Sequence, residues 1–219
     1  MLGLMHGRAP IEHVLRTPRR RGGDGSSPVV FMAIALALTS VGRLAVADAH
    51  QSPAKRPDAA QLAPYVPTPQ QVVDRMLELA TVTKGDVVYD LGCGDGRIPI
   101  TAAKAYGARG VGVDIDPQRI AEANANATQA GVTHLVSFKL QDAMTTDVSE
   151  ATVVTLYLLS SSNLKLRPIL TRQLKAGARI VSHSFSMGDW QPDKVDTFTD
   201  SANNRRTLYL WKTDGTIRP

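Results

Sequence analysis

The amino-acid sequence predicts an α/β protein with an open, mostly parallel sheet and a closing antiparallel hairpin. Two strand-like segments, Val87–Asp90 and Gly110–Asp114, each end in an acidic residue and lead into a helix-forming stretch. Strands and helices then alternate as far as Phe185, and Asn203-Asn204 separates two final hydrophobic segments like the turn of a hairpin. Such alternation is typical of sheets whose helices cover both faces.

The first 49 residues have the composition of a signal peptide or a membrane anchor. A basic segment precedes an apolar run, Val29–Gly42, and Ala45-Val46-Ala47 follows at the spacing that signal peptidase prefers. This run is shorter than the ~20 residues that span a bilayer, which favours a cleaved signal, although a helix continuing to Ala47 would give an uncleaved anchor. We therefore expect an exported (periplasmic) or membrane-anchored protein of a bacterial cell envelope. The alternative is an anchor whose domain faces the cytoplasm, against which the arginines before the apolar run argue.

The positive charge of the chain belongs mainly to this leader. The chain has 219 residues and a formal net charge of +5. Residues 1–47 contain six arginines and two acids, so the remainder is nearly neutral, with 19 basic and 18 acidic residues. Because nucleic-acid binding needs concentrated positive charge, we expect no nucleic-acid partner. The single cysteine and the scattered histidines lack zinc-ligand spacing, so we expect no metal, and the length suits one monomeric domain.

A short linker precedes the first helix of the predicted domain, residues 65–219. Residues 50–64 are rich in Pro and Ala, a composition typical of linkers. Thr68 is the predicted N-cap and Pro69 the first residue of a helix whose apolar residues recur on one face.

Three glycines at alternate positions, Gly92, Gly94 and Gly96, follow the first strand. Because glycine has no Cβ, a ligand can lie against such a main chain, while the next helix presents free N–H groups. A dinucleotide-binding loop would have its third glycine one residue later, and a P-loop would continue with Gly-Lys-Ser/Thr. The spacing therefore predicts a nucleotide-binding loop of another kind. We expect Cys93 to be a small residue packed under the ligand, with a reactive thiol as the alternative.

The second strand ends at Asp114, 24 residues after Asp90. An acid at this strand tip can accept hydrogen bonds from both hydroxyls of a ribose. The helix before this strand should end at Gly107, Asp116-Pro117 predicts the start of the next helix, and that helix should end before Gly131. Its residues predicted to face inward are Ile120, Ala123, Asn124 and Ala127.

The remaining strands are predicted in order at Leu135–Leu140, Ala151–Leu159, Ala178–Phe185, Val195–Phe198 and Arg206–Lys212, with a helix at Leu164–Leu174. Open α/β sheets bind ligands beyond the carboxyl ends of their strands. The end of the fourth, central strand should therefore face the reaction partner. Ser160–Asn163 follows it, either as a plain loop that caps the next helix or as part of the acceptor site.

The sequence from Asp90 to Gly96 resembles the first motif of the class I S-adenosylmethionine-dependent methyltransferases. The resemblance implies a Rossmann-like, doubly wound seven-strand sheet with a C-terminal antiparallel hairpin, and S-adenosylmethionine as cofactor. Tyr65 and Thr68 either only begin the first helix or also close the cofactor pocket, and Asp142 either faces the adenine or lies in a solvated loop. The cofactor-binding residues that the resemblance implies are Tyr65, Thr68, Asp90, Gly92, Cys93, Gly94, Gly96, Asp114, Ile115, Asp142 and Ala143.

A finer resemblance is to the membrane-anchored lysine methyltransferases of mitochondria and their bacterial relatives. It rests on Pro67-Thr68-Pro69, Asp90–Ile98, Arg179–Ser182 and Asp189-Trp190, and it covers roughly residues 65–212. It implies methylation of a protein lysine or another amine. The acceptor-side candidates are Tyr157, Asn163, His183 and Trp190, although His183 is equally a candidate buried strand histidine and Trp190 a candidate core residue.

Two other functions stay open from the sequence. One is methylation of a small molecule or an envelope lipid, which a leader that reaches the membrane would suit. The other is a non-catalytic protein of the same fold that binds a nucleoside, which export would favour because S-adenosylmethionine is made in the cytosol.

Overall fold

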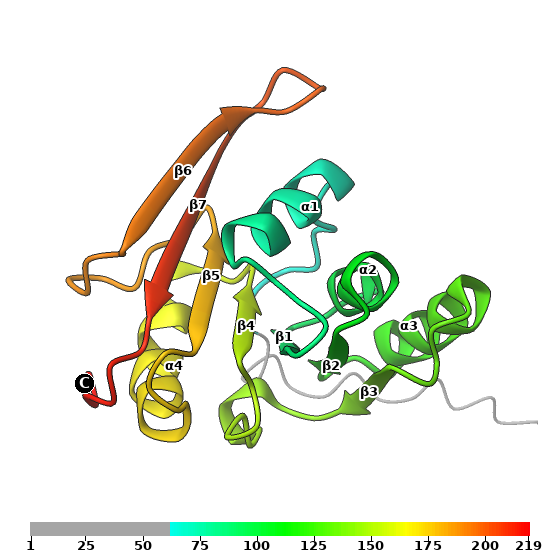
Figure 1. Cartoon of the computed structure of the whole chain (residues 1–219), viewed down its shortest axis with the longest axis horizontal. Coiled ribbons are helices and arrows are strands. Elements are labelled where there is room, and N and C mark those ends of the chain that lie inside the picture. The colour runs from blue at the N-terminus through cyan, green and yellow to red at the C-terminus, as the bar shows by residue number, and fades with distance from the viewer. Residues whose placement is uncertain (1–61) are drawn as a thin grey trace, which may run out of the picture. The chain divides into compact units, whose positions relative to one another are not determined.

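Seven strands form one mixed sheet in residues 62–219, the part of the chain that the computed structural model describes. The sheet order is β3-β2-β1-β4-β5-β7-β6 (Figure 1). Strands β1 to β5 pair in parallel, whereas β7 is antiparallel to both β5 and β6. This confirms the predicted fold class. The strands are β1 Val87–Leu91, β2 Arg109–Asp114, β3 Val136–Leu140, β4 Val153–Leu156, β5 Arg179–His183, β6 Lys194–Thr199 and β7 Arg205–Lys212.

Helices cover both faces of this sheet. One face packs against α1 (Gln70–Leu79), α2 (Arg97–Tyr106) and α3 (Pro117–Ala130), and the other against α4 (Ser160–Gln173). Alternate strand residues therefore enter two separate cores, because successive side chains of a strand point to opposite faces. On β4, for example, Val153 packs on the α1 side and Leu156 on the α4 side.

The ends of α2 and α3 follow the predicted local signals. Asp116 accepts a hydrogen bond from the Gln118 amide at 2.8 Å, and Gly107 and Gly131 end the two helices in left-handed conformations. The inward orientation predicted for Asn124 is wrong, because that residue is exposed. Asn126 is turned inward instead, and its side-chain amide donates to the Asp95 carbonyl at 2.9 Å.

The start of α1 differs from the prediction by one residue. Pro69, not Thr68, occupies the N-cap, and its carbonyl accepts hydrogen bonds from the amides of Val72 and Val73. Thr68 is buried, and its carbonyl accepts a hydrogen bond from Arg97 at 2.7 Å. A tertiary contact therefore takes Thr68 away from the capping role.

Strands β4 and β5 are both shorter at their carboxyl ends than predicted. The chain leaves the sheet at Tyr157, and α4 begins at Ser160, so Ser160–Asn163 forms the first helical turn rather than a loop. Strand β5 ends at His183 because Ser184 adopts φ +66°, which a strand does not accommodate. Within residues 62–219, none of the helices combines the length and the apolar character that a membrane span requires.

Candidate active site

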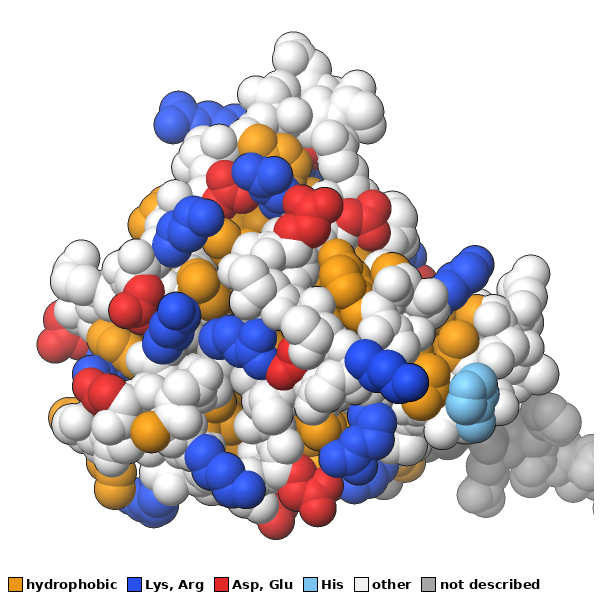
Figure 2. Space-filling view, in the orientation of Figure 1, with side chains coloured by type: hydrophobic (Ala, Val, Ile, Leu, Met, Phe, Trp, Pro, Cys, Tyr) orange, Lys and Arg blue, Asp and Glu red, His pale blue; other side chains and the backbone are white. Residues whose placement is uncertain are grey.

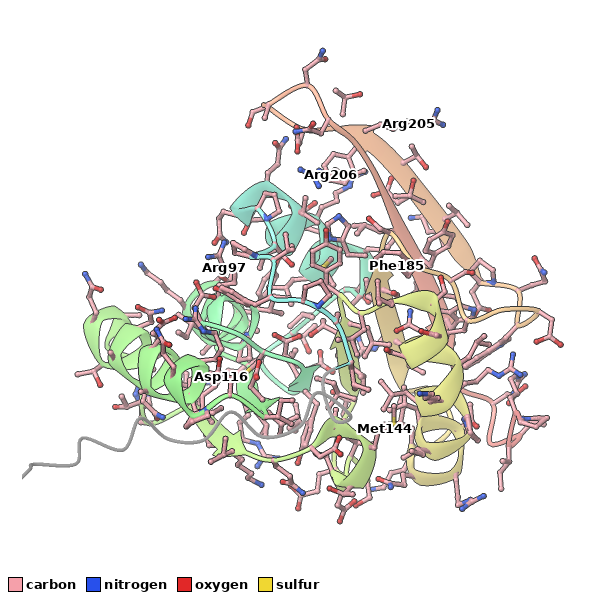
Figure 3. All side chains as sticks on the ribbon, turned by 180° about the vertical axis from the view of Figure 1, so that it is seen from behind. Arg97, Asp116, Met144, Phe185, Arg205 and Arg206 are labelled. Carbon is pink, nitrogen blue, oxygen red and sulfur yellow. The ribbon has the colours of Figure 1, made fainter. Side chains whose placement is uncertain are left out.

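A cleft of about 900 Å³ lies at the carboxyl ends of β1, β2 and β4. Residues 62–68, here called the strap, line it just before α1 begins. Ten of the eleven predicted cofactor residues also line it, and Gly96 is the exception. In Figure 3, Arg97 and Asp116 lie on one side of this region, and Phe185 lies across from them near the end of β5.

The glycine loop is tied to the neighbouring strand by its backbone. The amides of Gly92 and Cys93 both donate to the Val113 carbonyl at 2.9 Å. A Cβ on Gly94 would lie 2.4 Å from the Tyr65 ring, so this glycine lets the strap approach the loop. A Cβ on Gly96 would lie 2.6 Å from the Phe138 ring, so this glycine serves packing behind the cleft.

Asp90 is a buried carboxyl group that opens on the cleft. The hydroxyl of Thr155 donates to its Oδ1 at 2.8 Å. Burial raises the pKa of Asp90 to about 7, and the charges of Asp114 and Asp95 act in the same direction. A cationic ligand group beside Asp90 would favour its ionised form.

Asp114 has a second function that the sequence does not reveal. Its Oδ2 accepts a hydrogen bond from the Gly94 amide at 2.9 Å, and its Oδ1 accepts one from the Asp116 amide at 3.0 Å. Each carboxylate oxygen can accept more than one hydrogen bond, so both keep capacity for ligand hydroxyls. Asp114 thus fixes the glycine loop while it faces the cleft.

Asp142 and Cys93 complete the predicted cofactor side of the cleft. Asp142 caps the short 3-10 helix η2 (Ala143–Thr145) by accepting a hydrogen bond from the Met144 amide at 2.8 Å. Its second oxygen has no protein partner among the described residues. Cys93 is buried, and burial together with Asp90 and Asp114 raises the pKa of its thiol far above the usual range. The thiol is therefore a packing group, because thiolate formation governs cysteine reactivity.

The strap is held at both ends and in the middle. Ser162 donates its hydroxyl proton to the Leu62 carbonyl at 2.5 Å, and Arg97 donates to the Thr68 carbonyl at 2.7 Å. Arg97 is itself fixed by side-chain hydrogen bonds to both carboxylate oxygens of Asp95. The Arg119 guanidinium lies 4.4 Å from the centroid of the Tyr65 ring. The sequence does not predict that Arg97 and Arg119 hold the strap. Arg97 lies within the motif Asp90–Ile98, but only the fold shows that it contacts Thr68.

The four acceptor-side candidates do not all lie at the cleft. Tyr157 lines the cleft, and the His183 ring packs against it with centroids 4.0 Å apart. Asn163 is fully buried outside the lining, where its amide donates to Ser182 and to the Phe185 carbonyl, both at 3.1 Å. Trp190 packs against Trp211 with ring centroids 5.9 Å apart, also outside the lining.

His183 is buried, and neither ring nitrogen has a hydrogen-bond partner in the described part of the chain. Burial lowers the pKa of His183 to about 4, and the charge of Arg206 adds to this effect. The imidazole is therefore neutral near pH 7 and is a poor acceptor for a proton from an alkylammonium group.

The charges that line the cleft are mostly negative. Five aspartates line it, against two arginines; Arg97 pairs with Asp95, and Arg119 pairs with Glu122 at 2.7 Å. No group of His, Cys, Asp or Glu within residues 62–219 could hold a metal ion. The cleft thus favours a cationic ligand and disfavours a polyanion.

These features fit the cofactor that the sequence resemblance implies. A glycine-lined floor, a buried carboxyl group at the end of β1 and an acid with free acceptor capacity at the end of β2 suit a nucleoside that carries an ammonium group. The residues that would hold it are Asp90, Gly92, Gly94, Asp114 and Asp142, with Tyr65 above them.

The family model of the ANTKMT methyltransferase domain matches residues 90–194. A protein-lysine N-methyltransferase of Saccharolobus islandicus is 50% identical over 149 residues, which are 68% of this chain and 92% of that protein. The adenine nucleotide translocase lysine N-methyltransferase of Mus musculus is 31% identical over 132 residues, and the match spans 60% of this chain but only 57% of the mouse protein.

Among solved structures, an RNA methyltransferase from Salinibacter ruber, in complex with S-adenosyl-L-homocysteine, is 55% identical. The match covers 70% of this chain and 97% of that one, with a TM-score of 0.65. TrmN from Thermus thermophilus, at 16% identity and a TM-score of 0.54, shares the fold.

Proposed function

The chain belongs to the class I S-adenosylmethionine-dependent methyltransferases, and we propose that its acceptor is the side-chain amine of a lysine in a protein. The 50% identical relative named as a protein-lysine N-methyltransferase supports this acceptor, and so does the mouse enzyme. Because both relatives are named as enzymes, they weigh against the alternative that this chain binds a nucleoside without catalysis.

The cofactor S-adenosylmethionine supplies a sulfonium methyl group that is already a good electrophile. Within the proposed site, Asp90 would pair with the ammonium group of the methionine part and Asp114 with the ribose hydroxyls. Asp142 would face the adenine, while Tyr65 and the strap cover the bound nucleoside. The protein then has to align the acceptor and exclude water rather than supply a nucleophile of its own.

The single observation that carries the choice of lysine is the negative charge of the cleft. Five aspartates against two paired arginines attract a lysine ammonium and repel a phosphodiester backbone. On the face shown in Figure 2, Lys and Arg side chains are scattered among Asp and Glu rather than gathered in one stripe. The charge of the cleft lining argues against RNA as the acceptor, the substrate class named for the structure from Salinibacter ruber.

Lysine must lose a proton before it can accept a methyl group. Transfer from water into a partly apolar cleft lowers the pKa of an amine, because desolvation penalises its charged form. Tyr157 and Leu158 supply such surroundings at the end of β4. His183 is poorly suited to act as the base, since burial lowers its pKa to about 4 and so makes the imidazole a weak proton acceptor.

The test is methyl transfer from radiolabelled S-adenosylmethionine to separated membrane-protein, ribosomal-protein, total-RNA and lipid fractions of a bacterial extract. We expect label in a protease-sensitive product, and mass spectrometry should place it on lysine. Added S-adenosylhomocysteine should suppress it. Label that ribonuclease removes, or that partitions with lipid, would contradict the proposal.

We also propose that residues 1–49 direct the protein to the cell envelope, as the sequence predicts; these residues lie outside the described part. Fractionation of cells that express the full chain or residues 50–219 tests this. The full chain should leave the cytosolic fraction, and N-terminal sequencing shows whether the leader is cleaved. Recovery of both forms in the cytosol would contradict the proposal.

A further inference from the structure

Phe185, which no sequence motif singles out, lies beside the acceptor end of the cleft. Its ring stacks near Tyr157 with centroids 6.3 Å apart and an interplanar angle of 29°. Both rings are half-buried; Tyr157 lines the cleft, and Phe185 lies next to Tyr157, just outside the lining. The His183 ring supports Tyr157. Figure 3 shows Phe185 where β5 ends, beside the start of α4. Tyr157 and Phe185 are here called the aromatic wall.

An uncommon turn sets the position of Phe185. Its amide donates to the His183 carbonyl at 2.9 Å across Ser184, which has φ +66°. A γ-turn with a positive φ at a residue other than glycine is rare and strained. Such strain persists only where the surroundings hold it, and it is concentrated at functional sites.

Hydrogen bonds with Thr207, Ser182 and Asn163 hold this turn. The Ser184 amide donates to the Thr207 carbonyl on β7 at 2.8 Å. The Phe185 carbonyl accepts hydrogen bonds from the Ser182 hydroxyl at 2.7 Å and from the Asn163 amide at 3.1 Å. Asn163 and Ser182 are both fully buried. They are thus positioning residues that act through Phe185, which gives Asn163 a different place from the one the sequence suggested.

We propose that Phe185 is a specificity-determining residue, and that the aromatic wall binds the aliphatic stem of the lysine acceptor. The inference rests on the proposed function and adds the feature that selects the length of the amine side chain. Ring faces offer the methylenes an apolar surface and attract the cationic head that approaches along them. An acceptor with a shorter stem would lose part of this contact or fail to reach the cleft.

The experiment compares poly-L-lysine with poly-L-ornithine, whose side chain is one methylene shorter, as acceptors for the full chain. A single methylene in an apolar site is discriminated by about tenfold or more, so the wild type should prefer lysine by that factor in kcat/KM. Phe185→Ala should raise KM for poly-L-lysine and reduce the preference to about twofold, while Phe185→Leu should keep part of it. Calorimetric affinity for S-adenosylmethionine should stay the same in both variants.

Phe198→Ala is the matched control, because Phe198 is also half-buried but lies on β6, where the Arg75 guanidinium rather than Tyr157 lies near its ring. It should leave the preference for lysine unchanged. If Phe185→Ala also leaves that preference unchanged, or weakens cofactor binding to the same extent as methyl transfer, Phe185 does not select the acceptor. If the wild type methylates RNA and neither polymer, the proposed function itself is contradicted.

Discussion

On the proposed cofactor side of the cleft, Gly92, Gly94 and Asp114 come from one strand–helix–strand unit, and backbone hydrogen bonds join them. On the acceptor side, the contacts join different units of the fold. Asn163 on α4 donates to the Phe185 carbonyl beyond β5, and the Ser184 amide donates to the Thr207 carbonyl on β7. The glycine loop and Asp114 are therefore positioned within one unit, whereas the acceptor side exists only once β7 has paired with β5.

The largest effect should follow from Asp114→Ala. The change removes the hydrogen bond that holds Gly94 as well as the contacts proposed for the ribose. Two hydrogen bonds to a charged group contribute about 3–6 kcal/mol, so calorimetry should find S-adenosylmethionine binding weakened by at least about 100-fold.

Asp147→Ala is the control for that change. Asp147 is exposed, lies outside the cleft lining and accepts a hydrogen bond from the Ser149 amide, so its loss should lower the free energy of unfolding only slightly and leave binding intact. Equal losses of binding in the two variants, with both proteins folded by circular dichroism, would remove the special role of Asp114.

A smaller loss of cofactor affinity is expected from a change at Arg97, which holds the strap. Arg97→Ala removes the hydrogen bond to the Thr68 carbonyl that holds one end of the strap. A charge-assisted hydrogen bond at a partly exposed site contributes about 1–2 kcal/mol, so affinity should fall about tenfold, mainly through faster cofactor dissociation in stopped-flow traces. Lys104→Ala removes a basic residue from the exposed part of the same helix and should change nothing. Unchanged dissociation in Arg97→Ala would mean that the strap does not retain the cofactor.

Local signals explain why so much of the first three strands was predictable. Gly107, Gly131 and Asp116 fix helix ends through their own backbone preferences, and all three lie where the sequence places them. Thr68 and Ser184 could not be predicted in the same way. Thr68 has the chemistry of a helix cap, but its carbonyl accepts a hydrogen bond from Arg97, 29 residues away. Ser184 adopts a conformation that its residue type disfavours. Tertiary contacts overrode the local preference at both positions.

The pH dependence of cofactor binding tests the cofactor side by itself. The raised pKa of Asp90, about 7, means that ammonium binding must release a proton below that pH. Affinity should therefore fall as the pH drops from 8 to 6, by up to about tenfold. Asp90→Asn should abolish the dependence, and calorimetry in buffers with different ionisation enthalpies should detect the released proton. A pH-independent affinity in the wild type would contradict pairing between Asp90 and the ligand ammonium.

The same carboxyl group should make the stability of the unliganded protein change with pH in the opposite direction to cofactor affinity. Its pKa lies above the value of 3.8 expected in the unfolded chain, so between about pH 4 and 7 the folded state holds a proton that the unfolded state releases. The free energy of unfolding should consequently decrease as the pH rises through this window. Denaturant titrations of wild type and Asp90→Asn would show whether the decrease depends on Asp90.

The smallest effect is expected at Trp190, which the sequence suggested for the acceptor side but which lies outside the cleft lining. Its ring packs on Trp211 and under the Arg218 guanidinium, 4.6 Å from the ring centroid. The hydrogen bond that it accepts from the Trp211 indole uses its backbone carbonyl, so Trp190→Phe preserves that contact. We expect kcat/KM to change by less than about twofold, with a small loss of stability. A drop of tenfold or more in kcat/KM at an unchanged Tm would extend the acceptor site to this edge of the sheet, beyond the aromatic wall.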